Sequence, residues 1–145
     1  MEMVVRVRVK MRTSSGDLIT SALANTGYEA DEPEVVLPVR AAERLGLYPA
    51  LPSGTEVEEY VGVGGSVVRA FRAPGALEIS VLTSDKESRS VRAVAVVMPE
   101  EEEVILSDKA IDALGVVLLK PGEGIWRFSD DPPHVERSSE RKEAW

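Results

Sequence analysis

Residues 22–27 carry the chain's strongest candidate for a chemical site. A short apolar run leads into Asn25, Thr26 and Gly27. The Asn25 amide can donate and accept hydrogen bonds, but it is not a base with a pKa near the working pH, as water activation needs. Asn and Gly also populate ordinary turns for conformational reasons, so the tripeptide alone leaves that alternative open.

A second candidate is the glycine-rich segment Gly62, Val63, Gly64 and Gly65. A phosphate-binding loop would be followed by Lys-Ser/Thr and a helix, and neither is present. Glycines supply the positive φ that a hairpin tip needs, and β-prone residues flank the segment on both sides. We therefore predict a hairpin over residues 56–63 and 66–74.

Carboxylates form two groups. Glu29, Asp31, Glu32 and Glu34 follow the tripeptide and predict a solvated acidic loop, while Asp108 predicts a helix cap. Carboxylates of either group are the alternative source of the acid or base that the Asn25 amide lacks, although nothing in the pattern favours this. The run 100–103 predicts a solvated turn, because adjacent carboxylates do not converge on one metal ion.

Sulfur and imidazole are scarce. The chain has no cysteine, which excludes disulfides, thiolate nucleophiles and sulfur-ligated zinc. Its single histidine, His134, lies in a polar, proline-flanked stretch and predicts a solvated side chain. We expect no cofactor and no metal.

Length and charge limit the class of protein. At 145 residues, the chain predicts one domain, and its net charge of −8 makes nucleic acid an unfavourable partner. No apolar run reaches the roughly 18 residues of a membrane helix, and the start lacks a signal-peptide layout. These features predict a cytoplasmic protein without a membrane partner.

The residue pattern predicts mostly strands. Val5, Val7, Val9 and Met11 alternate with basic residues, which indicates a strand with one buried and one basic face. Further strands are predicted at 18–24, 35–38, 77–82, 91–98, 104–106, 116–119 and 125–128. Helices are predicted at 39–47 and from the Ser107 cap through residue 114.

The aromatic pair Trp126 and Phe128 predicts a core or dimer contact. Arg69 and Arg72 are interpreted as solvent-facing strand residues. Residues 1–128 are predicted to form the domain. Residues 129–145, which are polar, charged and proline-containing, predict a disordered tail.

In this order, the elements resemble the retroviral-type (retropepsin-like) aspartic proteases, and more closely the single-lobed archaeal and bacterial members of that clan. Residues 22–27 match the family's apolar-Asp-Thr/Ser-Gly turn, and residues 36–47 match its strand and helix. The glycines at 62–65 lie where its flap would be, and residues 104–115 match its second apolar strand and closing helix. The resemblance covers about residues 4–128.

The resemblance implies a mostly β, closed-barrel-like retropepsin (acid protease) fold with one or two short helices. In this family each subunit supplies one active-site loop, so it also implies a homodimer with a composite cleft beneath two flaps. The two Asn25 side chains would meet at the two-fold axis, the Thr26 hydroxyls would lock the loops, and Gly27 would allow close backbone approach.

Two positions depart from the family pattern. Ser107 stands where the family usually has glycine, and Asn25 stands where it has the catalytic aspartate. An aspartate pair works because one carboxylate keeps its proton while the other activates water, and an amide does neither. The first expectation is therefore an inactive or very weak protease homologue whose dimer cleft binds an extended peptide.

Two alternatives stay open: an active aspartic endopeptidase whose aspartate at position 25 was mutated or modified to Asn, and a structural dimer without a ligand.

Overall fold

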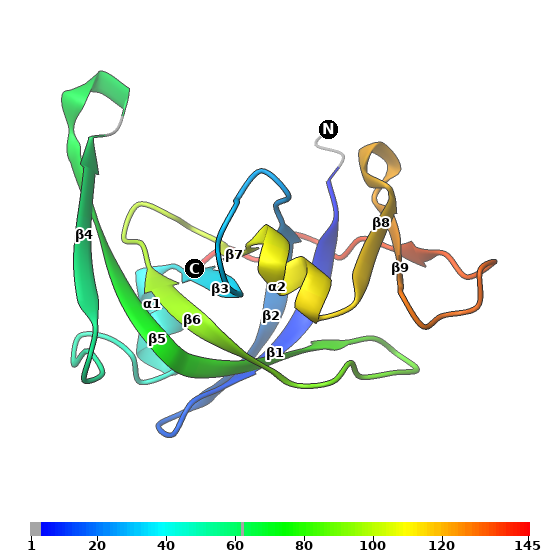
Figure 1. The fold of residues 1–145 in the computed structure, drawn as a ribbon, viewed down its shortest axis with the longest axis horizontal. Helices are drawn as coiled ribbons and strands as arrows, with labels where there is room; N and C mark the ends of the chain where they lie inside the picture. The colour runs from blue at the N-terminus through cyan, green and yellow to red at the C-terminus, as the bar shows by residue number, and fades with distance from the viewer. Residues whose placement is uncertain (1–3, 62) are drawn as a thin grey trace.

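The computed structural model describes residues 4–61 and 63–145. The fold is mostly β with short helical segments (Figure 1). In chain order, the elements are β1 (Arg6–Arg12), β2 (Asp17–Ala24), β3 (Glu34–Leu37), α1 (Val39–Arg44), β4 (Glu56–Val61), the 3-10 helix η1 (Val63–Gly65), β5 (Val67–Leu82), β6 (Val91–Val97), β7 (Val104–Leu106), α2 (Asp108–Ala113), β8 (Val116–Lys120), the 3-10 helix η2 (Pro121–Glu123), β9 (Ile125–Phe128) and β10 (Arg137–Ser138).

Six strands close into a barrel in the order β1-β2-β7-β3-β6-β5, because β1 pairs with β5 as well as with β2. The pairs β2–β7 and β3–β6 are parallel, and the other pairs are antiparallel. β4 extends the sheet beyond the barrel, and β8, β9 and β10 form a separate small sheet. The closed β-barrel expected from the sequence is therefore present.

The alternation in β1 predicts its two faces correctly, with one exception. Val7, Val9 and Met11 are fully buried inside the barrel, where apolar area removed from water contributes roughly 25 cal/mol per Å². On the basic face, Arg6 is also buried, and its guanidinium donates two hydrogen bonds to Glu103 at 2.9 and 3.2 Å. The predicted solvated turn at 100–103 is thus wrong for Glu103.

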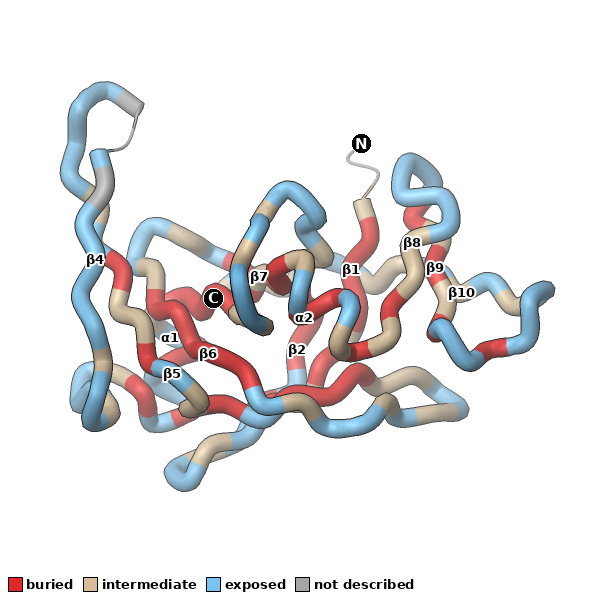
Figure 2. Tube along the Cα trace, in the orientation of Figure 1, coloured by how far each residue is buried: buried red, intermediate tan, exposed pale blue. Residues whose placement is uncertain are grey.

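β3 and β6 are buried on both faces, as their continuous apolar runs suggest (Figure 2). Alternate residues of both strands point into the barrel core. Val36, Val94 and Val96 point the other way and form a second apolar cluster with Ala70. Two residues of this outer cluster, Val36 and Val96, also line a surface cavity.

β5 is one strand of 16 residues, where the sequence predicted two. Its register with β6 shifts between Ala73 and Leu77, at Pro74 and Gly75, and Gly75 has a φ of 62°. Proline lacks the N–H that a regular ladder needs, so a bulge accommodates it without ending the strand. On the N-terminal side of the bulge, residues 67–72 of β5 pair with β4 as a projecting hairpin (Figure 1, green).

Both predicted helices are present and short. The predicted helix over 39–47 ends earlier, at Arg44, and Gly46 follows with a φ of 73°. Ser107 caps α2 as predicted, since its side chain accepts a hydrogen bond from the Ala110 N–H. Among the described residues, no helix is long and apolar enough to span a bilayer.

The β8–β9 hairpin places its aromatic residues in the core, which is one of the two predicted locations. Trp126 and Phe128 are buried, and their rings lie 5.0 Å apart edge to face. The Arg137 guanidinium lies over both rings, 5.9 and 5.1 Å from their centroids. A residue of the tail therefore completes this cluster.

The structure differs from the prediction of a disordered tail at 129–145. β10 pairs with β9, and the chain then crosses β1 and β2 (Figure 1, red). Glu143 exchanges two hydrogen bonds with Ser21, and the Trp145 indole donates one to Thr20. Polar composition suggests disorder, but here the polar groups have specific partners, which only the folded arrangement reveals.

The ion pair between Arg137 and Asp131 should stabilise the folded tail. Arg137 donates to both carboxylate oxygens of the buried Asp131 and to Asp85. Arg137→Met keeps the aliphatic stem but leaves the Asp131 carboxylate without this partner, so we expect a loss of about 2–4 kcal/mol in the free energy of unfolding. Urea titration at neutral pH measures it.

The stabilisation that Arg137 provides should depend on pH. Arg137 holds the pKa of Asp131 well below its usual range and that of Asp85 at about 2. Depressed carboxyl pKa values stabilise the fold above the unfolded pKa of roughly 4, and this stabilisation is lost as the pH falls toward 2. The difference in the free energy of unfolding between wild type and Arg137→Met should therefore shrink as the pH falls from about 4 to about 2. Lys120→Met, which removes an exposed 4.0 Å pair with Glu136, is the control; an equal loss in both variants would contradict the assignment.

Candidate functional site

Asn25, Thr26 and Gly27 form an exposed turn directly after β2. The Asn25 N–H donates to the Leu106 carbonyl of β7 at 3.2 Å, and the Asn25 Oδ1 accepts from the Gly27 N–H at 3.0 Å. A side chain at position 27 would place its Cβ 3.2 Å from that oxygen, so glycine suits the close approach. The amide thus shapes its own loop and remains accessible at the surface.

Ser107 is bonded to Glu34, where the loop after Asn25 ends and β3 begins. Its hydroxyl is fully buried and accepts hydrogen bonds from the Glu34 N–H at 3.0 Å and the Ala110 N–H at 3.2 Å. Its own N–H donates to the Glu34 carbonyl. The Ser107 side chain therefore joins β3 to the start of α2.

Asp108 fastens the other end of the loop. Its Oδ1 accepts from the Ala30 N–H at 3.0 Å and the Lys109 N–H at 2.7 Å, while its own N–H donates to the Tyr28 carbonyl. The prediction that Asp108 caps the helix is wrong, because Ser107 is the N-cap and Asp108 is the first residue of α2. The Asp108 carboxylate instead positions the chain after Gly27. These backbone contacts hold it in a structural role, which argues against its replacing a catalytic acid.

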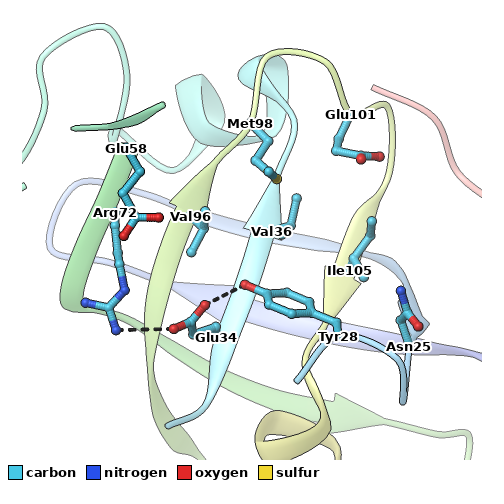
Figure 3. A pocket seen from close by; sticks show the side chains of 10 residues that line it. All are labelled: Asn25, Tyr28, Glu34, Val36, Glu58, Arg72, Val96, Met98, Glu101 and Ile105. Atoms are coloured by element: carbon cyan, nitrogen blue, oxygen red, sulfur yellow. Dashed lines mark hydrogen bonds and ion pairs between the residues drawn. The ribbon is translucent and has the colours of Figure 1, made fainter. Parts of the chain in front are cut away.

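A cavity of about 320 Å³ opens beside Asn25, between its loop and the β4–β5 hairpin (Figure 3). Its lining combines an apolar floor with charged and polar edges. It comprises Asn25, Tyr28, Glu34, Val36, Glu58, Arg72, Val96, Met98, Glu101 and Ile105. The volume lies at the lower end of the range for ligand pockets, roughly 300–1,000 Å³.

One edge of the cavity carries a hydrogen-bonded chain of side chains. The Tyr28 hydroxyl donates to Glu34 at 2.6 Å, and the Arg72 guanidinium donates to Glu34 at 3.2 Å and to Glu32 at 2.9 Å. The hydrogen bond to Glu32, with that to Glu34, raises the pKa of Arg72. The expectation that Arg72 is a plain solvent-facing residue is wrong, as is a fully solvated acidic loop, because Glu34 is half-buried.

The sequence did not single out most of these lining residues. Alternation along the hairpin offers the only signal: Glu58 opposes the buried Ala70, and Glu56 opposes Arg72. Residues on that face point toward the outer cluster, whereas Glu59, opposite Arg69, lies on the reverse face. The sequence does not show which face of the β4–β5 hairpin is directed at the cavity, because this depends on how the hairpin packs against the outer cluster.

The tip of the hairpin is the predicted glycine-rich segment. Gly64 and Gly65 adopt φ values of 86° and 82°, as predicted for a tip, within η1. Gly62 lies outside the described residues, and Val63 begins η1. Val61 and Val67, paired at the start of the tip, are 73% and 61% exposed. An exposed apolar pair on a projecting hairpin suits contact with another molecule.

The described residues contain no group of three or more His, Asp or Glu side chains that could hold a metal ion. His134 is exposed in a turn of the tail, away from the residues that line the cavity. Comparison with protein-family models and with curated protein sequences gives no match.

The buried hydroxyl of Ser107 provides a test of how the loop is held. Ser107→Ala removes the acceptor for two N–H groups, those of Glu34 and Ala110. We expect a loss of about 2 kcal/mol in the free energy of unfolding, because a lost cap and a buried unpaired donor each cost about 1 kcal/mol or more.

Denaturant titration measures this loss, with Ser84→Ala as the control because Ser84 is exposed. A Ser107→Ala variant as stable as the control would show that the hydroxyl does not hold the loop.

Proposed function

We propose that this chain is a homologue of the retropepsin-like aspartic proteases that has lost catalysis, and that it acts as a homodimeric peptide-binding protein. The observation that carries the proposal is the exposed Asn25-Thr26-Gly27 turn, which opens onto a cavity beneath a projecting hairpin.

The exposed side chains of the Asn25-Thr26-Gly27 turn support a site formed jointly by two copies of the chain. Thr26 is exposed, and its hydroxyl has no hydrogen-bond partner among the described residues of the single chain. A second copy related by a two-fold axis would bring a second Thr26 and Asn25 to the same place, which satisfies the hydroxyls and amides mutually. Two amides avoid the like-charge repulsion of an aspartate pair.

The hairpin supports the choice of an extended peptide. β4 pairs with β5 on one edge, and among the described residues no strand pairs with its other edge. An extended segment can add to such an edge through main-chain hydrogen bonds, while its alternate side chains enter a pocket below. The cavity beside Asn25 is such a pocket.

The chemistry of Asn25 argues against hydrolysis. An amide neither activates a water molecule nor protonates a leaving amine, and each of these contributions is worth roughly 10²-fold to 10⁴-fold in rate. Two acids that border the Asn25 loop are held by other groups: Glu34 is bonded to Tyr28 and Arg72, and Asp108 to backbone N–H groups. Binding without turnover follows.

The proposal predicts a dimer in solution. Multi-angle light scattering at micromolar concentration should give twice the chain mass of 15.7 kDa. Thr26→Ala should weaken the dimer about thirtyfold, because each of two hydroxyls loses a hydrogen bond worth about 1 kcal/mol. Ser90→Ala, another exposed hydroxyl, is the control. A monomeric wild type would remove the composite cleft.

The proposal also predicts that Asn25→Asp restores chemistry. Two carboxylates meeting at the axis would share a proton below about neutral pH, so an unfolded protein substrate should be cleaved and pepstatin should inhibit the cleavage. Wild type and Asn25→Ala should show no cleavage above background in the same mass-spectrometric assay.

The cleavage assay distinguishes an inactive protease homologue from an active enzyme. An Asn25→Asp variant that folds, dimerises and cuts nothing would contradict descent from a protease. Cleavage by the unaltered protein would favour the active-enzyme alternative.

A further inference from the structure

Two unpaired carboxylates distinguish the cavity from an ordinary apolar pocket. Glu58 on β4 and Glu101 on the β6–β7 connection lie on either side of its floor (Figure 3). Neither carboxylate makes a hydrogen bond or an ion pair with any described residue. A solvated glutamate needs no partner, but two that flank one cavity present it with negative charge from both sides.

The cation that lines the cavity does not offset this charge. Arg72 is already bonded to Glu34 and Glu32, and its side chain is only 19% exposed. Because Glu32 and Glu34 share this one guanidinium, it has no positive charge left to offset a third carboxylate. Glu58 and Glu101 remain as an uncompensated pair, within a chain whose net charge is already −8.

The floor between the two carboxylates is apolar. Val36 and Val96 belong to the outer cluster, with Met98 and Ile105 packed against it and partly exposed. A ligand that suits both features has an aliphatic stem to cover the floor and a cationic end to reach the rim. Lysine and arginine side chains have this form, since they bury their methylene stems while the charged head stays near water or an acid.

We infer that the cavity takes a lysine or arginine side chain of the extended peptide, with its cation between Glu58 and Glu101. The inference rests on the proposed peptide-binding function and names its substrate class: a segment with a basic residue at the position that faces the cavity. Electrostatic complementarity of this kind sets specificity and association rate more than affinity.

Peptide pools test the inference. Fluorescent octapeptides carry one fixed central residue, which is Lys, Arg, norleucine, Gln or Glu, and uncharged residues elsewhere; anisotropy measures their binding to the full chain. We expect the Lys and Arg pools to bind about fivefold to tenfold more tightly than the norleucine pool, as expected for a partly exposed charge pair. Added salt should narrow the difference.

Matched variants locate the effect. Glu58→Gln and Glu101→Gln should each reduce the preference for Lys and Arg about threefold, and the double variant should abolish it. Glu59→Gln is the control, because Glu59 lies on the same strand but faces away and pairs with Arg69 at 3.5 Å. Thermal unfolding checks that each variant is folded.

The outcomes distinguish the two proposals. Equal binding of the norleucine and Lys pools, or an equal loss in Glu59→Gln, overturns the basic-residue inference and leaves the peptide cleft standing. Failure of every pool to bind overturns both.

Discussion

Closure of the barrel through β1 is the constraint on which the rest of the structure depends. β1 pairs with β2 along its whole length and with the end of β5 along Arg8–Arg12. Because β5 must reach β1 at one end, the bulge near Pro74 redirects its other end out of the barrel, where it pairs with β4. The same closure places the end of β2 beside β7, so the Asn25 loop and the hairpin border one cavity.

Charge is distributed unevenly over this framework. Three buried or half-buried acids have cations: Glu103 has Arg6, Asp131 has Arg137, and Glu34 has Arg72. A carboxylate removed from water without such a partner would be costly, so these pairs belong to the folded framework. The acids left without partners lie where solvent or a ligand can reach them, and two of them flank the cavity.

The residue at position 25 separates architecture from chemistry. Its backbone N–H joins the loop to β7 and its side-chain oxygen closes the turn, contacts that an aspartate could make equally well. What the amide lacks is a proton that it can exchange near neutral pH. In the proposed function, the cleft therefore keeps its architecture without catalysis, and its role is selective binding.

The sequence by itself determined the local elements: the alternation in β1, the Ser107 cap and the positive-φ glycines at the hairpin tip all follow from short-range sterics and hydrogen bonding. It also marked Asn25 as a candidate site residue, and the structure places Asn25 at the edge of a cavity. Only the tertiary structure decided that β5 is one bulged strand, that the tail binds across β1 and β2, and that Glu58, Glu101 and Asn25 share a cavity. These features depend on pairings between residues far apart in the chain, and composition and periodicity carry no information about which distant partner a polar side chain meets.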